Sequence, residues 1–319
     1  MIPGVTDVHV LGIDAGGTKT VCLLADEDGA VLGEARGGGA NLQTEGELGV
    51  EKVLHAVMHE ALGRREPSVA AICLGMAGMD REGERAVVGE IMRRIGGGAR
   101  VVVVNDALVA LVAGVGDDPG VVIISGTGSI AYGRNRDHAA ARAGGWGHVL
   151  GDEGSGYWIG RRAMRAVARA ADGRGPATEL VARVLEHFSV TRPSELVTEV
   201  YDGEAHHPGL ARLAQVVQRA RDEGDELATQ ILEQAAHELV RAARSVVERL
   251  RMQEETFDFV LSGGVFAGVP WLTEELQRRL PAIAARAGVR RLEVQPAMGA
   301  VRLALAEARE GARVPSYVD

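Results

Sequence analysis

The sequence predicts an α/β fold in which one strand–turn–strand unit occurs twice. Short β-branched runs suited to strands alternate with longer segments whose apolar residues recur at helical spacing. Gly120–Gly133 repeats the order of the first unit: a strand enters a glycine-rich turn and a second strand leaves it. We therefore expect an internal duplication with a boundary near Ala113–Gly120. The 319 residues are enough for two domains, and 43 of them are glycine, about twice the usual share.

In the first part of the chain we expect three antiparallel strands followed by alternating helices and strands. The Asp28-Gly29 pair between two apolar runs is a hairpin signal. The predicted strands are 8–14, 21–26, 31–36, 69–74 and 100–104, and the predicted helices are about 45–64, 83–95 and 105–115.

The second part should begin with strands and continue as a mostly helical region. Strands are predicted at 120–124 and 130–133, and helices from Ser155 to about Arg251. Breaks in this helical region are predicted at 173–176, 190–193 and 206–209, where glycine or proline interrupts the pattern. The chain should end with a strand at 257–261, a helix at about 270–287, a strand at 291–294 and a helix at 297–309.

Composition excludes several classes of protein. The net charge of −9 argues against nonspecific nucleic-acid binding, which needs clustered cations. Cys22 and Cys73 lie far apart in apolar runs and match neither a zinc motif nor a disulfide framework. No apolar run has the ~18 residues of a membrane span, and Met1–Asp14 lacks the pattern of a signal peptide. We expect a cytoplasmic protein without nucleic-acid or membrane partners.

Three segments share a strand that runs into a glycine-rich turn: Val10–Thr20, Val121–Ser129 and Phe259–Val265. Glycine lets backbone amides converge on an anion, and hydroxyl groups can add further donors. The glycines and polar residues of the first two turns are Gly16, Gly17, Thr18, Lys19, Thr20, Gly126, Thr127, Gly128 and Ser129. One such turn alone would be an ordinary hairpin, but three together predict a site for a chain of phosphates.

Neither common phosphate motif fits these turns. Gly12 and Gly17 have the glycine spacing of a Walker A loop, but Lys19 comes one residue late. Val21–Ala25 is a strand, whereas both the Walker loop and the Rossmann fingerprint open a helix. The predicted phosphate loop therefore lies in a β-hairpin.

Two carboxylates follow predicted strands, at the edge of a sheet where ligands bind in α/β proteins. Asp14 ends the first strand and could hold a hydrated Mg²⁺ near phosphates. Asp106 follows the strand Val101–Val104 and is a candidate general base for a hydroxyl. Asn105-Asp106 is also a normal helix entry, so helix capping is an equal alternative, and one residue can do both.

The segment Gly144–Trp158 combines six glycines between Gly144 and Gly156, two tryptophans and adjacent acids. Tryptophan rings stack on the C–H faces of a sugar, and carboxylates accept hydrogen bonds from its hydroxyls. The alternative is a glycine loop packed by its aromatic residues, with Ser155 capping a helix. That alternative accounts for Tyr157 and Trp158 but leaves Asp152 unexplained.

These motifs resemble the N-acetylglucosamine kinase family, which belongs with the BadF/BadG-type ATPases in the sugar kinase, actin and heat-shock ATPase superfamily. The resemblance runs through nearly the whole chain, from Gly12–Thr20 onward. Its most specific parts are Gly144–His148 and Gly151–Ser155.

The resemblance implies the ligands of particular residues. Thr18 and Thr127 would contact ATP phosphates, and Gly263 and Gly264 would lie by the adenosine. The sugar-binding positions would be Asn41, Asp106, Gly145, Trp146, Gly147 and Asp152, with Asp106 as the base. Mg²⁺ would accompany ATP.

The fold implied is two lobes of duplicated ribonuclease H-like, actin-like ATPase topology with ATP and sugar in the cleft. We expect the N-terminal lobe to comprise residues 1–115 and about 297–319, and the C-terminal lobe residues 116–296 with helical insertions. The family also implies a homodimer.

The function expected is ATP-dependent phosphorylation of an amino sugar, N-acetylglucosamine first, at its C6 hydroxyl. Glucosamine, N-acetylmuramic acid and glucose are alternative substrates. Two other classes are a BadF/BadG-type ATPase activator, which needs cysteine ligands for an iron–sulfur cluster, and a non-enzymatic nucleotide switch.

Overall fold

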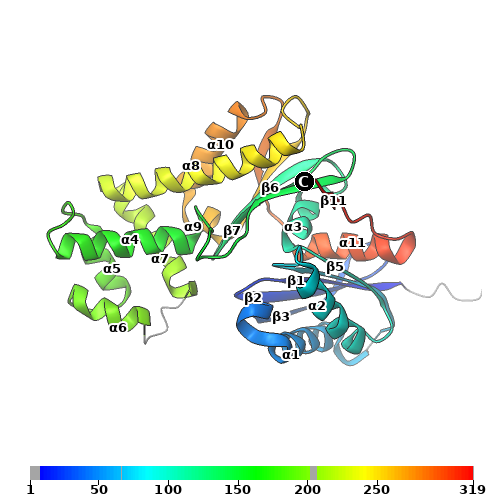
Figure 1. The fold of residues 1–319 in the computed structure, drawn as a ribbon. Coiled ribbons are helices and arrows are strands. Elements are labelled where there is room, and N and C mark those ends of the chain that lie inside the picture. The colour runs from blue at the N-terminus through cyan, green and yellow to red at the C-terminus, as the bar shows by residue number, and fades with distance from the viewer. Residues whose placement is uncertain (1–7, 66, 202–206, 319) are drawn as a thin grey trace, which may run out of the picture.

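The computed structural model describes residues 8–65, 67–201 and 207–318, which fold into two mixed β-sheets with helices on their faces (Figure 1). The first sheet has the order β3-β2-β1-β4-β5 and the second β10-β9-β6-β7-β8-β11. Their strands are β1 His9–Ala15, β2 Lys19–Ala25, β3 Val31–Gly38, β4 Val69–Met76, β5 Arg100–Val104, β6 Gly120–Ser125, β7 Ser129–Arg134, β8 Ala139–Gly144, β9 Asp258–Ser262, β10 Gly288–Arg291 and β11 Ser316–Tyr317.

The α-helices alternate with the strands in the first lobe and gather into a long insertion in the second. They are α1 Leu42–Leu62, α2 Glu82–Ile95, α3 Asp106–Val115, α4 Gly156–Ala171, α5 Leu180–His187, α6 Leu196–Tyr201, α7 His207–Asp222, α8 Glu226–Arg249, α9 Gly264–Gly268, α10 Pro270–Arg279 and α11 Ala297–Arg309. In the described part of the chain, none of these helices combines the length and apolar character needed to cross a membrane.

The two sheets repeat one topology. In each, three strands form an antiparallel meander, β1-β2-β3 and β6-β7-β8. The first strand of each meander then pairs in parallel with a later strand, β1 with β4 and β6 with β9, and a fifth strand follows on that side. The predicted α/β fold with an internal duplication is confirmed.

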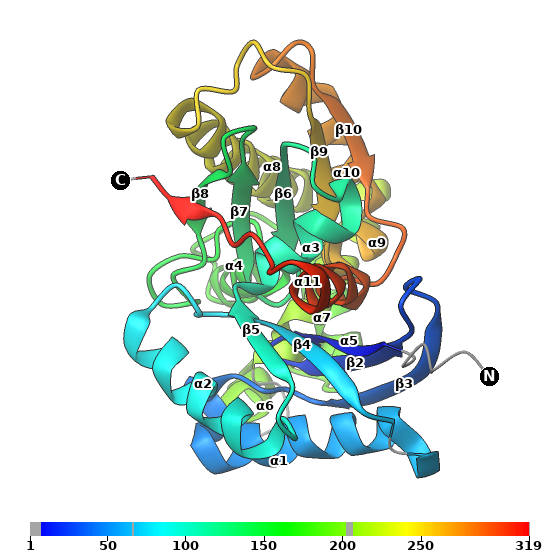
Figure 2. The ribbon, with the colours of Figure 1, turned by 90° about the vertical axis from the view of Figure 1, so that its right-hand side faces the viewer.

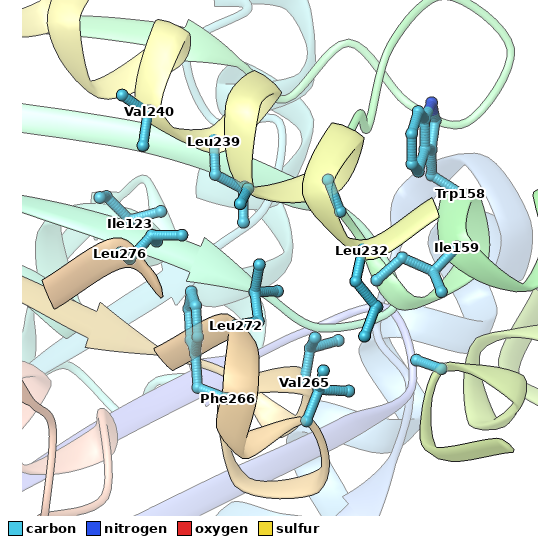
Figure 3. Packing of buried hydrophobic residues seen from close by; sticks show 14 of the residues in the cluster. Ile123, Trp158, Ile159, Leu232, Leu239, Val240, Val265, Phe266, Leu272 and Leu276 are labelled. Atoms are coloured by element: carbon cyan, nitrogen blue, oxygen red, sulfur yellow. The ribbon is translucent and has the colours of Figure 1, made fainter. Parts of the chain in front are cut away.

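Helices and sheets alternate in layers around three apolar cores (Figure 2). One core lies between the first sheet and the pair α1 and α2. The middle core contains residues of both sheets together with α3 and α11, so these two helices fill the space between the lobes. The third covers the other face of the second sheet, where side chains of β6, α4, α8, α9 and α10 meet (Figure 3).

The end of the chain passes from one sheet to the other. α11 packs on β1 and β4 of the first sheet and on α3. After it, Ser316 and Tyr317 pair in parallel with Ala139 and Ala140 of β8. The prediction that placed residues 297–319 with the first lobe therefore needs a correction, because the last strand belongs to the second sheet.

Several element boundaries differ from the predictions. The strand predicted at 291–294 is instead Gly288–Arg291, because its register is set by pairing with Asp258–Leu261 of β9. The helix predicted to reach Ala287 ends as an α-helix at Arg279. A break at 223–225 separates α7 from α8. The predicted break at 206–209 lies partly outside the described residues, and α7 already begins at His207.

Candidate active site

The first two glycine turns meet where the lobes face each other. The hydroxyl oxygens of Thr18 and Thr127 are 3.1 Å apart, although 109 positions separate them in sequence. Each turn is closed by a backbone hydrogen bond at its first glycine: the Gly16 amide donates to Lys19 at 2.9 Å, and the Gly126 amide to Gly128 at 2.9 Å. The two turns therefore lie next to each other at the boundary between the lobes. A site for several phosphates needs such converging turns.

The other two hydroxyls of these turns point into the protein. Thr20 donates to the carbonyl of Gly38 at 2.8 Å, and Ser129 donates to the carbonyl of Glu153 at 2.8 Å. Both residues are buried. Thr18 and Thr127 are thus better placed than Thr20 or Ser129 to contact a phosphate.

Three carboxylates gather at the carboxyl ends of the parallel strands of the first sheet. Asp14 lies in the last part of β1, Asp80 follows β4, and Asp106 follows β5 as the first residue of α3. β4 pairs in parallel with both β1 and β5, so these ends lie at the same edge of the sheet. Asp14 and Asp106 were predicted from the sequence, whereas Asp80 was not, although it carries the same signal, a carboxylate shortly after a buried strand.

The two predicted carboxylates repel each other in a poorly solvated place. Burial raises the pKa of Asp106 to about 7, and the negative charges of Asp14 and Asp80 add to this rise. Burial also raises the pKa of Asp14 to about 6, which the charge of Lys19 partly offsets. A carboxyl group that titrates near neutral pH is suited to accept a proton in catalysis.

The cap of α3 is Asn105 rather than Asp106. The Asn105 side chain accepts a hydrogen bond from the Ala107 amide at 2.8 Å, and its backbone has the extended conformation of an N-cap residue. Asp106 lies in the first helical turn, where the amides and the helix dipole favour a negative charge. Of the two roles left open for Asp106, helix capping therefore falls mainly to its neighbour.

Asp152 lies directly against the second glycine turn. Its carboxylate accepts a hydrogen bond from the Ser129 amide at 3.3 Å, and its backbone has φ of 60°. The next residues are held to the same turn, since Ser125 donates to the Gly154 carbonyl at 2.8 Å and the Gly156 amide to the Gly126 carbonyl at 2.8 Å. Burial raises the pKa of Asp152. This tethering joins the candidate sugar segment to the candidate phosphate turn.

The two tryptophans of this segment have different surroundings. Trp158 is 8% exposed and packs in the core of the second lobe, as the packing alternative predicts. Trp146 is 58% exposed, with the Arg142 guanidinium 4.8 Å from its ring centre. Gly145 before it donates to Ser129 at 3.0 Å, and Gly147 after it has φ of 81°. Trp146 is therefore the aromatic surface of the segment that a ligand can reach.

Asn41 and Gly263 each lie beside a glycine turn. Asn41 caps α1 by accepting from the Gln43 amide at 2.8 Å, and the preceding Ala40 amide donates to Gly16 of the first turn at 3.1 Å. Gly263 has φ of 111°, and a Cβ there would lie 2.2 Å from the carbonyl oxygen of Ser125, so only glycine fits where β9 meets the second turn. Gly264 then opens the short helix α9.

Comparison with known proteins agrees with this architecture. Residues 11–304 match the BadF/BadG/BcrA/BcrD ATPase family, and the chain belongs to that family. It is 36% identical to the N-acetylmuramic acid/N-acetylglucosamine kinase of Clostridium acetobutylicum over 94% of this chain and 99% of that protein. It is 35% identical to the N-acetyl-D-glucosamine kinase of Dictyostelium discoideum over 92% and 97% of the two chains.

Solved structures share the fold. A candidate N-acetylglucosamine kinase from Chromobacterium violaceum superposes with a TM-score of 0.72 and 29% identity, over 94% of this chain and 99% of that one. A glucokinase of the ROK family from Streptomyces griseus superposes with a TM-score of 0.58 at 19% identity, over 95% and 100% of the chains. The predicted two-lobed fold of the sugar kinases is confirmed.

Proposed function

We propose that this protein is an ATP-dependent kinase for an amino sugar, N-acetylglucosamine first, that phosphorylates the C6 hydroxyl with Asp106 as general base. The observation that carries the proposal is the contact between Thr18 and Thr127. It brings two phosphate-type turns together across the lobes. Asp106 follows a strand of the first sheet, and its pKa, raised to about 7, suits a base. The names of the relatives support the substrate class.

The reaction needs positioning more than covalent catalysis. The C6 oxygen of the sugar forms a bond to the γ-phosphorus while the bond from that phosphorus to the bridging oxygen of ADP breaks. The hydroxyl proton passes to a carboxylate oxygen of Asp106. We propose that Thr18, Thr127 and the turn amides hold the phosphates, that Gly263 and Gly264 border the adenosine, and that Asp152, Asn41 and the segment Gly145–Gly147 hold the sugar.

The donor set at the end of β1 fits a divalent cation. Burial raises the pKa of Asp14 to about 6, and Asp14 lies close enough to Asp106 for its charge to raise the pKa of that carboxyl. We propose that Asp14 holds Mg²⁺ through water beside the phosphates. The ion would neutralise phosphate charge, and Asp14 would accept hydrogen bonds from its water ligands.

The two rival classes lack support in the residues. Cys22 and Cys73 are buried in β2 and β4, and burial raises the pKa of the Cys22 thiol to about 12 and that of Cys73 further. Thiols held protonated in a sheet are unsuited to bind an iron–sulfur cluster. A non-enzymatic nucleotide switch binds no sugar, so it gives no reason for the hydrogen bonds that hold Asp152 and its segment against the second glycine turn. The lobe limits of 1–115 and 116–296, the cytoplasmic location and the homodimer stay predictions.

The proposal is tested by measuring ADP release with a panel of sugars. We expect N-acetylglucosamine to stimulate release far above the rate without sugar, and we compare N-acetylmuramic acid, glucosamine, glucose and N-acetylmannosamine. 6-Deoxy-N-acetylglucosamine should be inert, whereas the methyl glycoside, which blocks C1, should be phosphorylated. If no sugar stimulates release the kinase proposal is wrong, and if only the methyl glycoside is inert the acceptor is the C1 hydroxyl.

The raised pKa of Asp106 predicts the pH dependence of activity. Below about pH 7 the carboxyl group is protonated and cannot accept a proton, so kcat/KM for the sugar at low fixed ATP should fall tenfold per pH unit on the acid side. Saturating Mg–ATP should move this limb to lower pH, because a nearby cation favours the carboxylate. As a control for acid denaturation, enzyme returned from pH 5.5 to pH 8 must regain full activity. If kcat/KM at low ATP is constant between pH 5.5 and 8.5, Asp106 is excluded as the base.

A further inference from the structure

Asp80 has hydrogen-bonding partners from three other segments of the chain. One carboxylate oxygen accepts from the Asn105 side chain at 2.8 Å and lies 3.1 Å from Nε of Arg142. The other oxygen accepts from the hydroxyl of Tyr317. Asn105 belongs to the first lobe, whereas Arg142 and Tyr317 lie on β8 and β11 of the second sheet. Asp80 therefore connects the lobes at the edge of the candidate site.

Each partner of Asp80 connects it to a different part of that site. Asn105 precedes Asp106 and caps α3 with its other amide atom, so the bond to Asp80 fixes which way this amide faces. Arg142 donates to the Gly144 carbonyl at 2.8 Å and lies over the Trp146 ring. Asp80 thereby contacts the residue before Asp106 on one side and, on the other, the arginine that lies over Trp146.

The C-terminal strand is firmly attached to the second lobe. The amide of Val318 donates to Ala140 at 2.8 Å, and Arg249 of α8 donates to the Val318 carbonyl at 2.8 Å and the Arg142 carbonyl at 2.9 Å. From this attached strand the Tyr317 hydroxyl reaches the first lobe. Desolvation and the bond to Asp80 raise the pKa of that hydroxyl, so it remains a protonated donor at neutral pH.

We propose that Asp80 is a positioning residue that aligns Asp106 with the sugar segment, and that Tyr317 of the C-terminal strand completes this link between the lobes. The inference rests on the proposed function, since it assigns Asp80 to the alignment of that site. Asp80 acts through Asn105 and Arg142 and takes no part in proton transfer. The link predicts that a single hydroxyl near the C-terminus influences the rate of phosphoryl transfer.

The test is a double-mutant cycle of Asp80→Asn and Tyr317→Phe in the full chain. Each single variant should lower kcat, by about tenfold for Asp80→Asn, while KM for ATP stays within about twofold, because misalignment affects the transition state more than nucleotide binding. The double variant should be no slower than Asp80→Asn, since both changes break one link. Tyr201→Phe is the matched control, because Tyr201 is 76% exposed at the end of α6.

Hydrogen exchange gives a readout that needs no substrate. In both single variants the Ala107 amide, which Asn105 caps, should exchange roughly threefold faster or more, while Tyr201→Phe leaves it unchanged. Unchanged exchange at Ala107, unchanged kcat, or fully multiplicative effects in the double variant would each overturn the proposal. If no sugar supports ADP release but Ala107 responds as expected, the link stands and the kinase proposal fails.

Discussion

Asp106→Asn should abolish most of the activity and yet stabilise the protein. Removing the proposed general base should lower kcat by about 10²- to 10⁴-fold, the usual contribution of such a group. The amide has nearly the shape of the carboxylate and is always neutral. We expect KM for ATP to change little, because the phosphate turns are intact, so the loss falls on the chemical step. Initial rates of ADP release with the best sugar of the panel measure it.

The effect on stability follows from the raised pKa. The group ionises at about 3.8 when unperturbed but at about 7 in the folded protein, so its effect on stability becomes steadily less favourable as the pH rises from about 3.8 to about 7. Above pH 7 the folded protein bears the full cost of holding the charge. We expect Asp106→Asn to raise the thermal midpoint at pH 8 by about 2–4 °C, the shift produced by ~1 kcal/mol. At pH 5 the carboxyl is already neutral in the folded protein, and the gain should be smaller.

Asp172→Asn is the control for charge removal, because Asp172 pairs with Arg174 on the surface at the end of α4. Asp172→Asn should leave kcat unchanged. Its effect on the thermal midpoint should not increase between pH 5 and pH 8. Two results would contradict the assignment of Asp106. One is an Asp106→Asn enzyme that keeps more than a tenth of the activity; the other is a midpoint gain independent of pH.

The sequence predicted those helices and strands whose own residues favour the structure that they adopt in the fold. The strand–glycine turn–strand unit was recognisable twice because β-branched strands and glycine turns carry strong local signals. β8 was missed, since its sequence Ala139–Gly144 contains no β-branched residue and its structure depends on pairing with β7 and β11. β10 was displaced for the same reason, because its partner β9 sets the register.

The residues of the candidate site that belong to local sequence motifs could be predicted from the sequence. Asp14, Asp106 and the glycine turns follow strands directly, so their common location can be inferred from topology rules. Asn105 as the cap in place of Asp106, and the inward direction of Thr20 and Ser129, depend on side-chain partners that sequence does not reveal. Tyr317 carries no local signal, because its role exists only once β11 lies beside β8.

Gly299→Ala should be among the most destabilising small substitutions in the protein. Gly299 lies in α11 where that helix crosses α3, and a Cβ there would lie 1.9 Å from the Val109 carbonyl oxygen and 2.7 Å from the Ala113 amide nitrogen. Both are backbone atoms of α3, so no rotamer change can relieve the contact and the helices must separate. We expect a loss of about 2–3 kcal/mol or more in the free energy of unfolding, measured with urea.

Gly89→Ala is the same chemical change as Gly299→Ala, but it should stabilise the protein. Gly89 lies in α2, and a Cβ at this position meets no atom within 4 Å. Alanine here should stabilise the protein by about 0.5–1 kcal/mol, because it restricts the unfolded chain and favours the helix. If the two substitutions changed the stability in the same direction, the close approach of α3 and α11 would be wrong.

The crossing of α3 and α11 also connects stability with catalysis. α3 begins at Asp106, and both helices lie in the core shared by the two sheets. A shift of α3 that makes room for a methyl group at residue 299 would move the proposed base relative to Thr18 and Thr127. We therefore expect Gly299→Ala, assayed at a temperature where it is folded, to lower kcat, while Gly89→Ala leaves kcat unchanged. An unstable variant with full kcat would show that the packing between the lobes does not set the position of the base.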